Sequence, residues 1–168
     1  GISVRTTLLQ AWKDALAGDP VSAFGGVLIC NKTVDLETAK EIDQLFYEVL
    51  IAPDFEASAL DLLKGRKNRI LLKIKKWPNQ KILTKTALGG ELHQERDQSN
   101  LIASELKPVT NLVPSASQMD DLIFAARCTK HLKSNAISLV KSGQLIGMGC
   151  GQTSRVDATV QAIEKAKR

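Results

Sequence analysis

The feature that most constrains the fold is the span of residues 130–158, KHLKSNAISLVKSGQLIGMGCGQTSRVDA, in which several local signals follow one another. Residues 136–141 and 144–149 are short, apolar and partly β-branched, which is typical of strands. Ser142-Gly143 between them is a two-residue turn signal. We therefore predict an antiparallel hairpin in this span.

A glycine-rich bend follows the hairpin and leads into a helix. Ser154, with Asp157 three residues later, is typical of a helix N-cap, so a helix is predicted to start near Arg155. The free N–H groups of a helix start suit a phosphate or carboxylate, and Arg155 adds further donors. Three glycines precede this start and allow positive φ angles and a close approach of a ligand: Gly147, Gly149 and Gly151.

The spacing of these glycines matches neither the dinucleotide-binding pattern nor the P-loop pattern. Two interpretations therefore remain open. The bend could hold an anion, or it could be a glycine-rich exit from a hairpin with a surface arginine beside it.

Helical periods alternate with short apolar runs along the rest of the chain. This alternation predicts an α/β fold whose sheet is covered on both faces, and the hairpins make that sheet mixed. Predicted helices span residues 4–17, 36–47 with Asp35 as N-cap, 56–64, 119–132 and 155–167; predicted strands span 22–30, 49–52, 69–74 and 109–113, with a hairpin at 82–94.

Two further positions could belong to a site. Phe24-Gly25-Gly26 has no side-chain bulk at two successive positions, which permits either a ligand approach or a bulge packed against a helix. Glu48 lies at a helix–strand junction, where α/β folds can place ligand groups, although it could equally be a solvated residue. The helical period of residues 36–47 also predicts that Phe46 lies on the inner face of that helix.

The cysteine pattern indicates a cytoplasmic protein. Cys30, Cys128 and Cys150 are odd in number, widely spaced and set among apolar residues, as expected for reduced, buried thiols. No apolar run approaches the roughly 20 residues that span a bilayer, and no signal peptide is visible. No metal-ligand spacing is present either.

A basic block raises the question of nucleic-acid binding. Residues 64–85 carry nine Lys or Arg and no Asp or Glu, within a chain of net charge +5. Such a block could meet a phosphate backbone. Its interleaved apolar residues favour a strand with a solvated lysine face instead, and stacking aromatics are scarce in the chain, so we do not expect a nucleic-acid partner.

Three runs together resemble a known family. They are DPVSAFGG at residues 19–26, IAP at 51–53, and KSNAI followed by GMGCGQTSRVDA within 133–158. In order and spacing they resemble the formyltransferase part of the bifunctional purine-synthesis enzyme. That enzyme joins 5-aminoimidazole-4-carboxamide ribonucleotide (AICAR) transformylase to IMP cyclohydrolase. The resemblance covers nearly the whole chain.

The resemblance implies a three-layer, cytidine-deaminase-like α/β/α fold with a mixed sheet, and a homodimer with active sites at its interface. It also implies formyl transfer from 10-formyltetrahydrofolate to the AICAR amine. In the substrate site, Gly25 would meet the nucleotide, Glu48 would supply a carboxylate, Asn135 would hydrogen-bond the substrate and Arg155 would bind its phosphate or carboxamide region; Val21 and Val156 would border the folate.

The chain departs from the family where chemistry occurs. The family's catalytic Lys-His pair lies upstream of the resembling segment, and its aromatic substrate-closing segment lies downstream, so no catalytic residue is assigned in this chain. Lys130-His131 falls at a helix end where the family has no such pair. The zinc-deaminase signature is also missing, so we expect no metal.

We therefore expect residues 1–168 to be a single, incomplete AICAR transformylase-like domain with little activity in isolation. The alternative hypotheses are a noncatalytic module that binds a nucleotide or anion through Asn135 and Arg155, and a nucleic-acid binder that uses residues 64–85.

Overall fold

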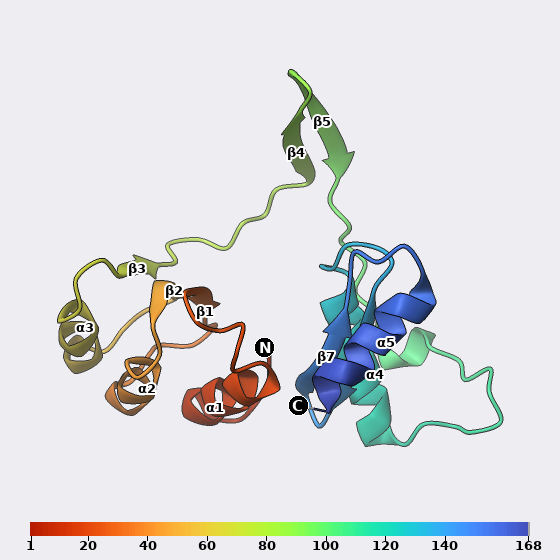
Figure 1. The fold of residues 1–168 in the computed structure, drawn as a ribbon, viewed down its shortest axis with the longest axis horizontal. Coiled ribbons are helices and arrows are strands. Elements are labelled where there is room, and N and C mark those ends of the chain that lie inside the picture. The colour runs from red at the N-terminus through yellow and green to blue at the C-terminus, as the bar shows by residue number, and fades with distance from the viewer. Residues whose placement is uncertain (168) are drawn as a thin grey trace.

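The computed structural model describes residues 1–167, and its helices and strands follow the predicted order except near residues 103–113 (Figure 1). Parallel strands, antiparallel strands and helices are all present, so the predicted α/β class is confirmed. The helices are α1 (Leu8–Gly18), α2 (Leu36–Ile42), α3 (Ala57–Lys64), the 3-10 turn η1 (Ala103–Glu105), α4 (Ala116–Thr129) and α5 (Arg155–Ala166). The strands are β1 (Gly26–Ile29), β2 (Tyr47–Ala52), β3 (Ile70–Lys73), β4 (Ile82–Ala87), β5 (Gly90–Glu95), β6 (Ile137–Lys141) and β7 (Gln144–Gly149).

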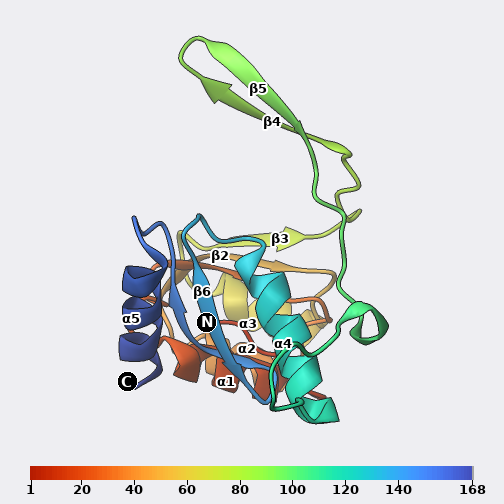
Figure 2. The same ribbon diagram turned by 90° about the vertical axis from the view of Figure 1, so that its right-hand side faces the viewer.

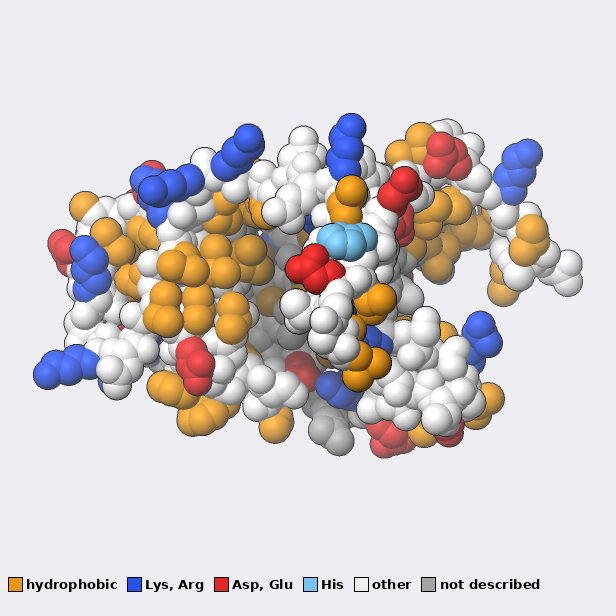
Figure 3. Space-filling view, turned by 90° about the horizontal axis from the view of Figure 1, so that it is seen from above, with side chains coloured by type: hydrophobic (Ala, Val, Ile, Leu, Met, Phe, Trp, Pro, Cys, Tyr) orange, Lys and Arg blue, Asp and Glu red, His pale blue; other side chains and the backbone are white. Residues whose placement is uncertain are grey.

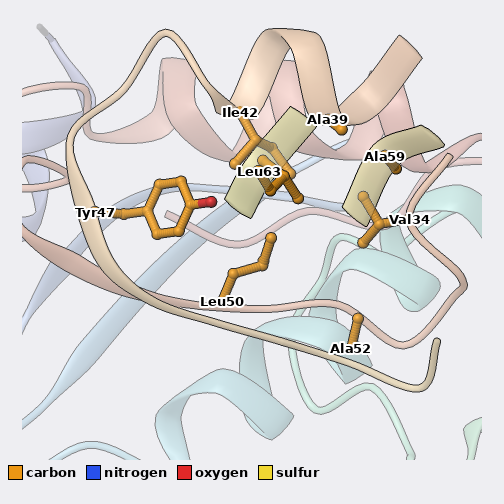
Figure 4. Packing of buried hydrophobic residues seen from close by; sticks show 8 residues of the cluster. All are labelled: Val34, Ala39, Ile42, Tyr47, Leu50, Ala52, Ala59 and Leu63. Atoms are coloured by element: carbon orange, nitrogen blue, oxygen red, sulfur yellow. The ribbon is translucent and has the colours of Figure 1, made fainter. Parts of the chain in front are cut away.

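Strands β1, β2 and β3 form a parallel sheet with β2 in its centre. Helices α1, α2 and α3 lie on one side of this sheet (Figures 1 and 2). Between the two layers lies a core of fully buried side chains, whose removal from water stabilises this half of the molecule (Figure 4). The core side chains are Val34, Ala39, Ile42, Tyr47, Leu50, Ala52, Ala59 and Leu63.

The sheets differ from our expectation in two respects. We expected one mixed sheet covered on both faces, but the described strands form three separate sheets, β1–β2–β3, β4–β5 and β6–β7. Residues 75–81 lead the chain away from β3, so the later hairpins do not join the parallel strands (Figure 2). The face of the parallel sheet opposite the helices is exposed, with Val27 at 65% and Ile29 at 63%.

The hairpin predicted from Ser142-Gly143 is confirmed. Strands β6 and β7 pair antiparallel, and the two turn residues have φ angles of 51° and 68°, as a type I′ turn requires. Asp121 of α4 accepts hydrogen bonds from both turn N–H groups, each at 2.7 Å. Helix α4 therefore holds the tip of the hairpin.

Helix α5 packs directly on strand β7, and two glycines make this packing possible. A Cβ atom on Gly149 would lie 2.0 Å from the Ala158 carbonyl oxygen, and one on Gly147 would lie 2.2 Å from that of Ala162. Neither of these two glycines adopts the positive φ that the sequence suggested for the bend. Gly151 has a φ of 66° and open space around it, so the positive φ predicted for the bend occurs at this glycine.

The N-terminal residues attach the parallel-sheet half to the β6–β7 hairpin. Ser3 forms an antiparallel bridge with Gln144, and backbone hydrogen bonds of 2.8 and 3.0 Å flank the bridge. Because these residues are extended, the helix predicted for residues 4–17 begins only at Leu8.

A two-stranded arm, β4–β5, projects from the rest of the molecule (Figure 2). All six residues of β5 are exposed, as are Ile82 of β4 and Leu88 at the tip. The hairpin predicted for residues 82–94 is therefore confirmed as an excursion from the main body.

Two other predicted elements differ in the structure. The helix predicted for residues 36–47 starts at its Asp35 cap but ends at Ile42, and Tyr47 already belongs to β2. Phe46 consequently lies outside the helix and is 52% exposed, so its predicted inner position is wrong. Residues 109–113 form a loop and not the predicted strand, since no other strand lies beside them.

The three cysteines are free thiols and partly buried. Burial raises the pKa of Cys30 to about 11 and also raises the pKa of Cys128, which keeps both thiols protonated. Among residues 1–167, no helix combines the length and the apolar content that crossing a bilayer requires.

The packing of α5 on β7 yields a stability test. Gly149→Ala should lower the free energy of unfolding by about 1–3 kcal/mol, because the added methyl group forces the helix off the strand. Gly90→Ala is the matched control, since its Cβ would meet nothing closer than 3.7 Å. Urea unfolding followed by circular dichroism measures both, and equal stabilities of the two variants would contradict the proposed contact.

Candidate functional site

The bend after β7 continues the hairpin as a short ladder. Asn135 and Gln152 exchange backbone hydrogen bonds of 3.0 and 3.4 Å, and the Gly151 N–H donates to the Lys133 carbonyl oxygen at 2.7 Å. The KSNAI and GCGQTS runs, which are distant in sequence, are therefore paired side by side. The Ser134–Asn135 peptide bond is cis.

The Asn135 side chain is used mainly as a donor within this ladder. Its Nδ2 atom donates to the carbonyl oxygens of Gln152 and Thr153, each at 3.1 Å. No hydrogen bond within residues 1–167 engages its Oδ1 atom. The side chain thus fixes the loop with its nitrogen and leaves an oxygen acceptor for a ligand.

Arg155 is the first residue of α5, at the helix start predicted from the sequence. Ser154 caps the helix by accepting from the Asp157 N–H at 3.0 Å, and its hydroxyl donates to the Asp157 carboxylate at 2.6 Å. Arg155 is exposed, and in the described part of the chain its guanidinium has no ion pair. This places a cation beside the positive end of the helix dipole, where it favours an anion.

Gln161, from the second turn of α5, holds the loop in place. Its Oε1 atom accepts from the Cys150 N–H at 3.0 Å and from Gln152 Nε2 at 3.4 Å. Gln152 Nε2 also donates to the Cys150 carbonyl oxygen at 3.1 Å. The loop that carries Asn135 and leads to Arg155 is therefore fixed by side chains as well as by the backbone.

Gly25 and Glu48 form a second group at the start of the parallel sheet. Gly25 has a φ of 69°, and its N–H donates to the Phe46 carbonyl oxygen at 2.9 Å. Glu48 is exposed beside the bulge between β1 and β2, at the amino end of its strand. Val21, from the loop before β1, is 75% exposed.

An exposed aromatic pair next to Gly25 was not anticipated from the sequence. The rings of Phe24 and Phe46 have centroids 5.0 Å apart and are inclined by 42°. They are 71% and 52% exposed. The helical period had assigned Phe46 to a core, and no local signal marked the pair because it depends on where α2 ends.

The structure does not bring the two groups into contact. An ion pair joins α5 to the loop that carries Val21: Lys165 Nζ lies 3.2 Å from Asp19 Oδ2. This pair lies near the C-terminal end of α5. Arg155 is ten residues away, or about 15 Å along the helix axis. Val156, which is 72% exposed, follows Arg155 in α5.

Several cavities lie elsewhere in the described part of the chain, and two of them border α4. One of about 460 Å³ lies between α4, β6 and the loop before α4, with Leu112, Leu122 and Leu139 in its lining. The other, of about 340 Å³, lies at the base of the arm and includes Lys130 and His131.

Lys130 and His131 follow α4 as the sequence predicted for a helix end. Lys130 caps the helix, and its Nζ atom donates to the Ser99 carbonyl oxygen at 2.9 Å. It also lies 3.5 Å from an Asp97 carboxylate oxygen. The hydrogen bond that the Ser99 N–H donates to Asp97, together with the nearby Lys130, lowers the pKa of Asp97. Lys130 thus has a structural role in joining α4 to the arm.

The basic block is partly neutralised by acidic partners. Arg69 and Arg66 pair with Asp43, and Lys73 pairs with Asp54 at 2.7 Å. The Arg69 side chain is only 7% exposed. The block also extends from α3 through β3 into the arm, so it does not form one basic face.

Nothing in the described residues resembles a metal centre, because no three His, Cys, Asp or Glu side chains gather closely enough to hold an ion. In an α/β fold, a cation and free amides at a helix start are suited physically to a phosphorylated or carboxylated ligand.

Comparison with known proteins identifies the family. The family described as AICARFT/IMPCHase bienzyme matches residues 1–165, and the chain belongs to it. A "Bifunctional purine biosynthesis protein PurH" of Bacteroides thetaiotaomicron is 50% identical over 167 residues, 99% of this chain and 33% of that protein. Proteins of the same name from Thermoanaerobacter sp. and Chlorobium phaeobacteroides are 42% and 45% identical, each over 99% of this chain. The chain spans about a third of the length of these relatives.

The hydrogen bonds and the ion pair of the Asp19 carboxylate predict a specific acid sensitivity. Burial raises the pKa of Asp19, but the N–H and hydroxyl of Ser22 together with Lys165 outweigh it and lower the pKa to about 2. The ionised form is therefore favoured in the folded state, and its stabilisation is present above about pH 4 and lost as the pH falls toward 2.

Asp19→Asn should therefore flatten the dependence of unfolding free energy on pH between about 4 and 2. Asp61→Asn is the control, because it removes an exposed carboxylate of α3 that has no ion pair within residues 1–167. Urea titrations across this pH range provide the measurement. An unchanged acid slope in Asp19→Asn would refute the contribution of the Asp19 carboxylate to stability.

Proposed function

We propose that this chain provides a substrate-recognition wall of a phosphoribosylaminoimidazolecarboxamide formyltransferase. This enzyme transfers a formyl group from 10-formyltetrahydrofolate to AICAR in purine biosynthesis. Family membership over residues 1–165 carries the proposal, and the Asn135–Arg155 geometry supports it. In longer family members an IMP cyclohydrolase would accompany this activity.

Arg155 would bind the anionic part of the ribonucleotide. Its guanidinium and the free N–H groups of the first turn of α5 offer several donors to one phosphate or to a carboxamide oxygen. Asn135 Oδ1 would accept a hydrogen bond from the amine or carboxamide N–H of AICAR, because Nδ2 is already used within the loop.

The second group would complete recognition. Gly25 would lie against the nucleotide and Glu48 would supply a carboxylate, while Val21 and Val156 offer exposed apolar surface to the folate. Because the two groups do not meet within this chain, a second copy could bring them together, as in a homodimer with sites at its interface. We place this reaction in the cytoplasm.

The binding role of Arg155 can be measured directly. Isothermal titration of the chain with AICAR should give weaker binding for Arg155→Ala by about tenfold or more, since a charge-assisted hydrogen bond contributes about 1.5–3 kcal/mol. Arg66→Ala is a matched control, because its side chain is 65% exposed and lies outside the site. Equal affinities of Arg155→Ala and the unmodified chain would remove Arg155 from the site.

The isolated chain should transfer no measurable formyl group. By the family resemblance, the Lys-His pair that activates the amine and stabilises the migrating formyl group lies upstream of the matched segment. A coupled assay of tetrahydrofolate formation tests this. His131→Ala should leave AICAR binding unchanged. Formyl transfer by the isolated chain that His131→Ala abolishes would instead assign catalysis to the pair at the end of α4.

A further inference from the structure

The loop between β7 and α5, which we call the site loop, comprises residues 150–154 with the sequence CGQTS. Its side chains are small or polar, so apolar packing contributes little to its shape. By contrast, the exposed face of the parallel sheet carries a patch of apolar side chains (Figure 3). The shape of the site loop therefore depends on the groups that hydrogen-bond to it.

The Gln161 side chain of α5 contacts the site loop at two points. Its Oε1 atom accepts from the Cys150 N–H at 3.0 Å and from Gln152 Nε2 at 3.4 Å. Helical side chains point back toward the N-terminus of their helix, which brings Gln161 over the loop that precedes α5. The close packing of the Ala158 carbonyl group on Gly149 keeps the loop within this reach. A single amide oxygen therefore holds both the start and the middle of the site loop.

Gln152 passes this restraint on to Asn135. The Gln152 carbonyl oxygen accepts from the Asn135 backbone N–H at 3.0 Å and from Asn135 Nδ2 at 3.1 Å. The Thr153 carbonyl oxygen accepts from the same Nδ2 atom at 3.1 Å. Because both acceptors belong to the site loop, the direction of the other amide atom, Asn135 Oδ1, follows the shape of that loop.

Gln161 itself lies outside the core. It is exposed, whereas its neighbours Ala158 and Ala162 are fully buried and form the contact between α5 and β7. Replacing Gln161 therefore leaves that contact in place. Its two hydrogen bonds act locally, on the geometry of the site loop, and contribute little to the packing of the domain.

We propose that Gln161 is a positioning residue of the candidate site, which acts through Gln152 to aim Asn135 Oδ1 at an N–H donor of the ligand. The inference rests on the proposed function and deepens it, since the donor is then the amine or carboxamide N–H of AICAR. Arg155 does not depend on Gln161, because the Ser154 cap and the helix hold its backbone. Loss of the Gln161 oxygen should weaken the contact at Asn135 and leave anion binding at Arg155 unchanged.

Three variants separate the oxygen of Gln161 from the bulk of its side chain. Gln161→Met removes the acceptor and keeps the length of the side chain, whereas Gln161→Glu keeps an acceptor oxygen at the same place. Val160→Met is the matched control, because it puts the same new side chain on a 54% exposed neighbour in α5. The added charge of Gln161→Glu would itself repel an anionic ligand, so this variant is used only without ligand.

Hydrogen exchange of the ligand-free chain, followed by nuclear magnetic resonance, measures the restraint on the site loop. In Gln161→Met the N–H groups of Cys150 and Asn135 should exchange about tenfold faster, while that of Ala162 in the middle of α5 should not change. Gln161→Glu and Val160→Met should keep the slow exchange. Equal acceleration at all three groups would assign Gln161 a role in overall stability alone, and no acceleration would show that it does not hold the loop; either result overturns the proposal.

Two ligands then separate an effect on Asn135 from an effect on Arg155. Titration with AICAR should give at least threefold weaker binding for Gln161→Met than for Val160→Met, because the Asn135 acceptor is no longer aimed at its donor. Inorganic phosphate, followed through the Arg155 resonances, should bind both variants equally. Equal affinities for AICAR, or an equal loss of affinity for both ligands, would refute the positioning role.

Failure of the unmodified chain to bind AICAR would be a separate result. It would reject the proposed function, whereas the exchange rates of the Cys150 and Asn135 N–H groups would still decide whether Gln161 holds Asn135 in place.

Discussion

The close contact between helix α5 and strand β7 is the constraint on which the candidate site depends. Backbone carbonyl groups of Ala158 and Ala162 lie where side chains of Gly149 and Gly147 would otherwise stand. With the helix held this close, Gln161 reaches the Cys150 N–H and fixes the loop between strand and helix. The position of Arg155 thus follows from two missing side chains in the strand before it.

Local signals predicted this region well, because each acts within a few residues. The turn at Ser142-Gly143 and the cap at Ser154 need only their own backbone angles and one hydrogen bond each. The role of the glycines could not be read in the same way. A glycine that permits a positive φ and a glycine that lets a helix pack closely look the same in the sequence. Only the packed structure distinguishes the role of Gly151 from that of Gly149.

Long-range contacts account for the main errors of prediction. The helical period continues past Ile42, but Arg69 donates to the carbonyl oxygens of Asp43 at 3.2 Å and Leu45 at 3.3 Å, which ends α2 there. The same guanidinium lies 4.3 Å from the centre of the Tyr47 ring. Arg69, which the sequence placed in a basic surface block, is therefore a buried cap of α2. By ending α2, it also determines the exposed position of Phe46 beside the candidate site.

The candidate site is divided between two parts of the structure. The Asn135 side chain is held by its hydrogen bonds within the loop, and the backbone of Arg155 is held by the helix start. Gly25 and Glu48 are fixed by a different sheet. The Asp19–Lys165 pair joins these halves near the C-terminal end of α5, whereas Arg155 lies at its N-terminal end.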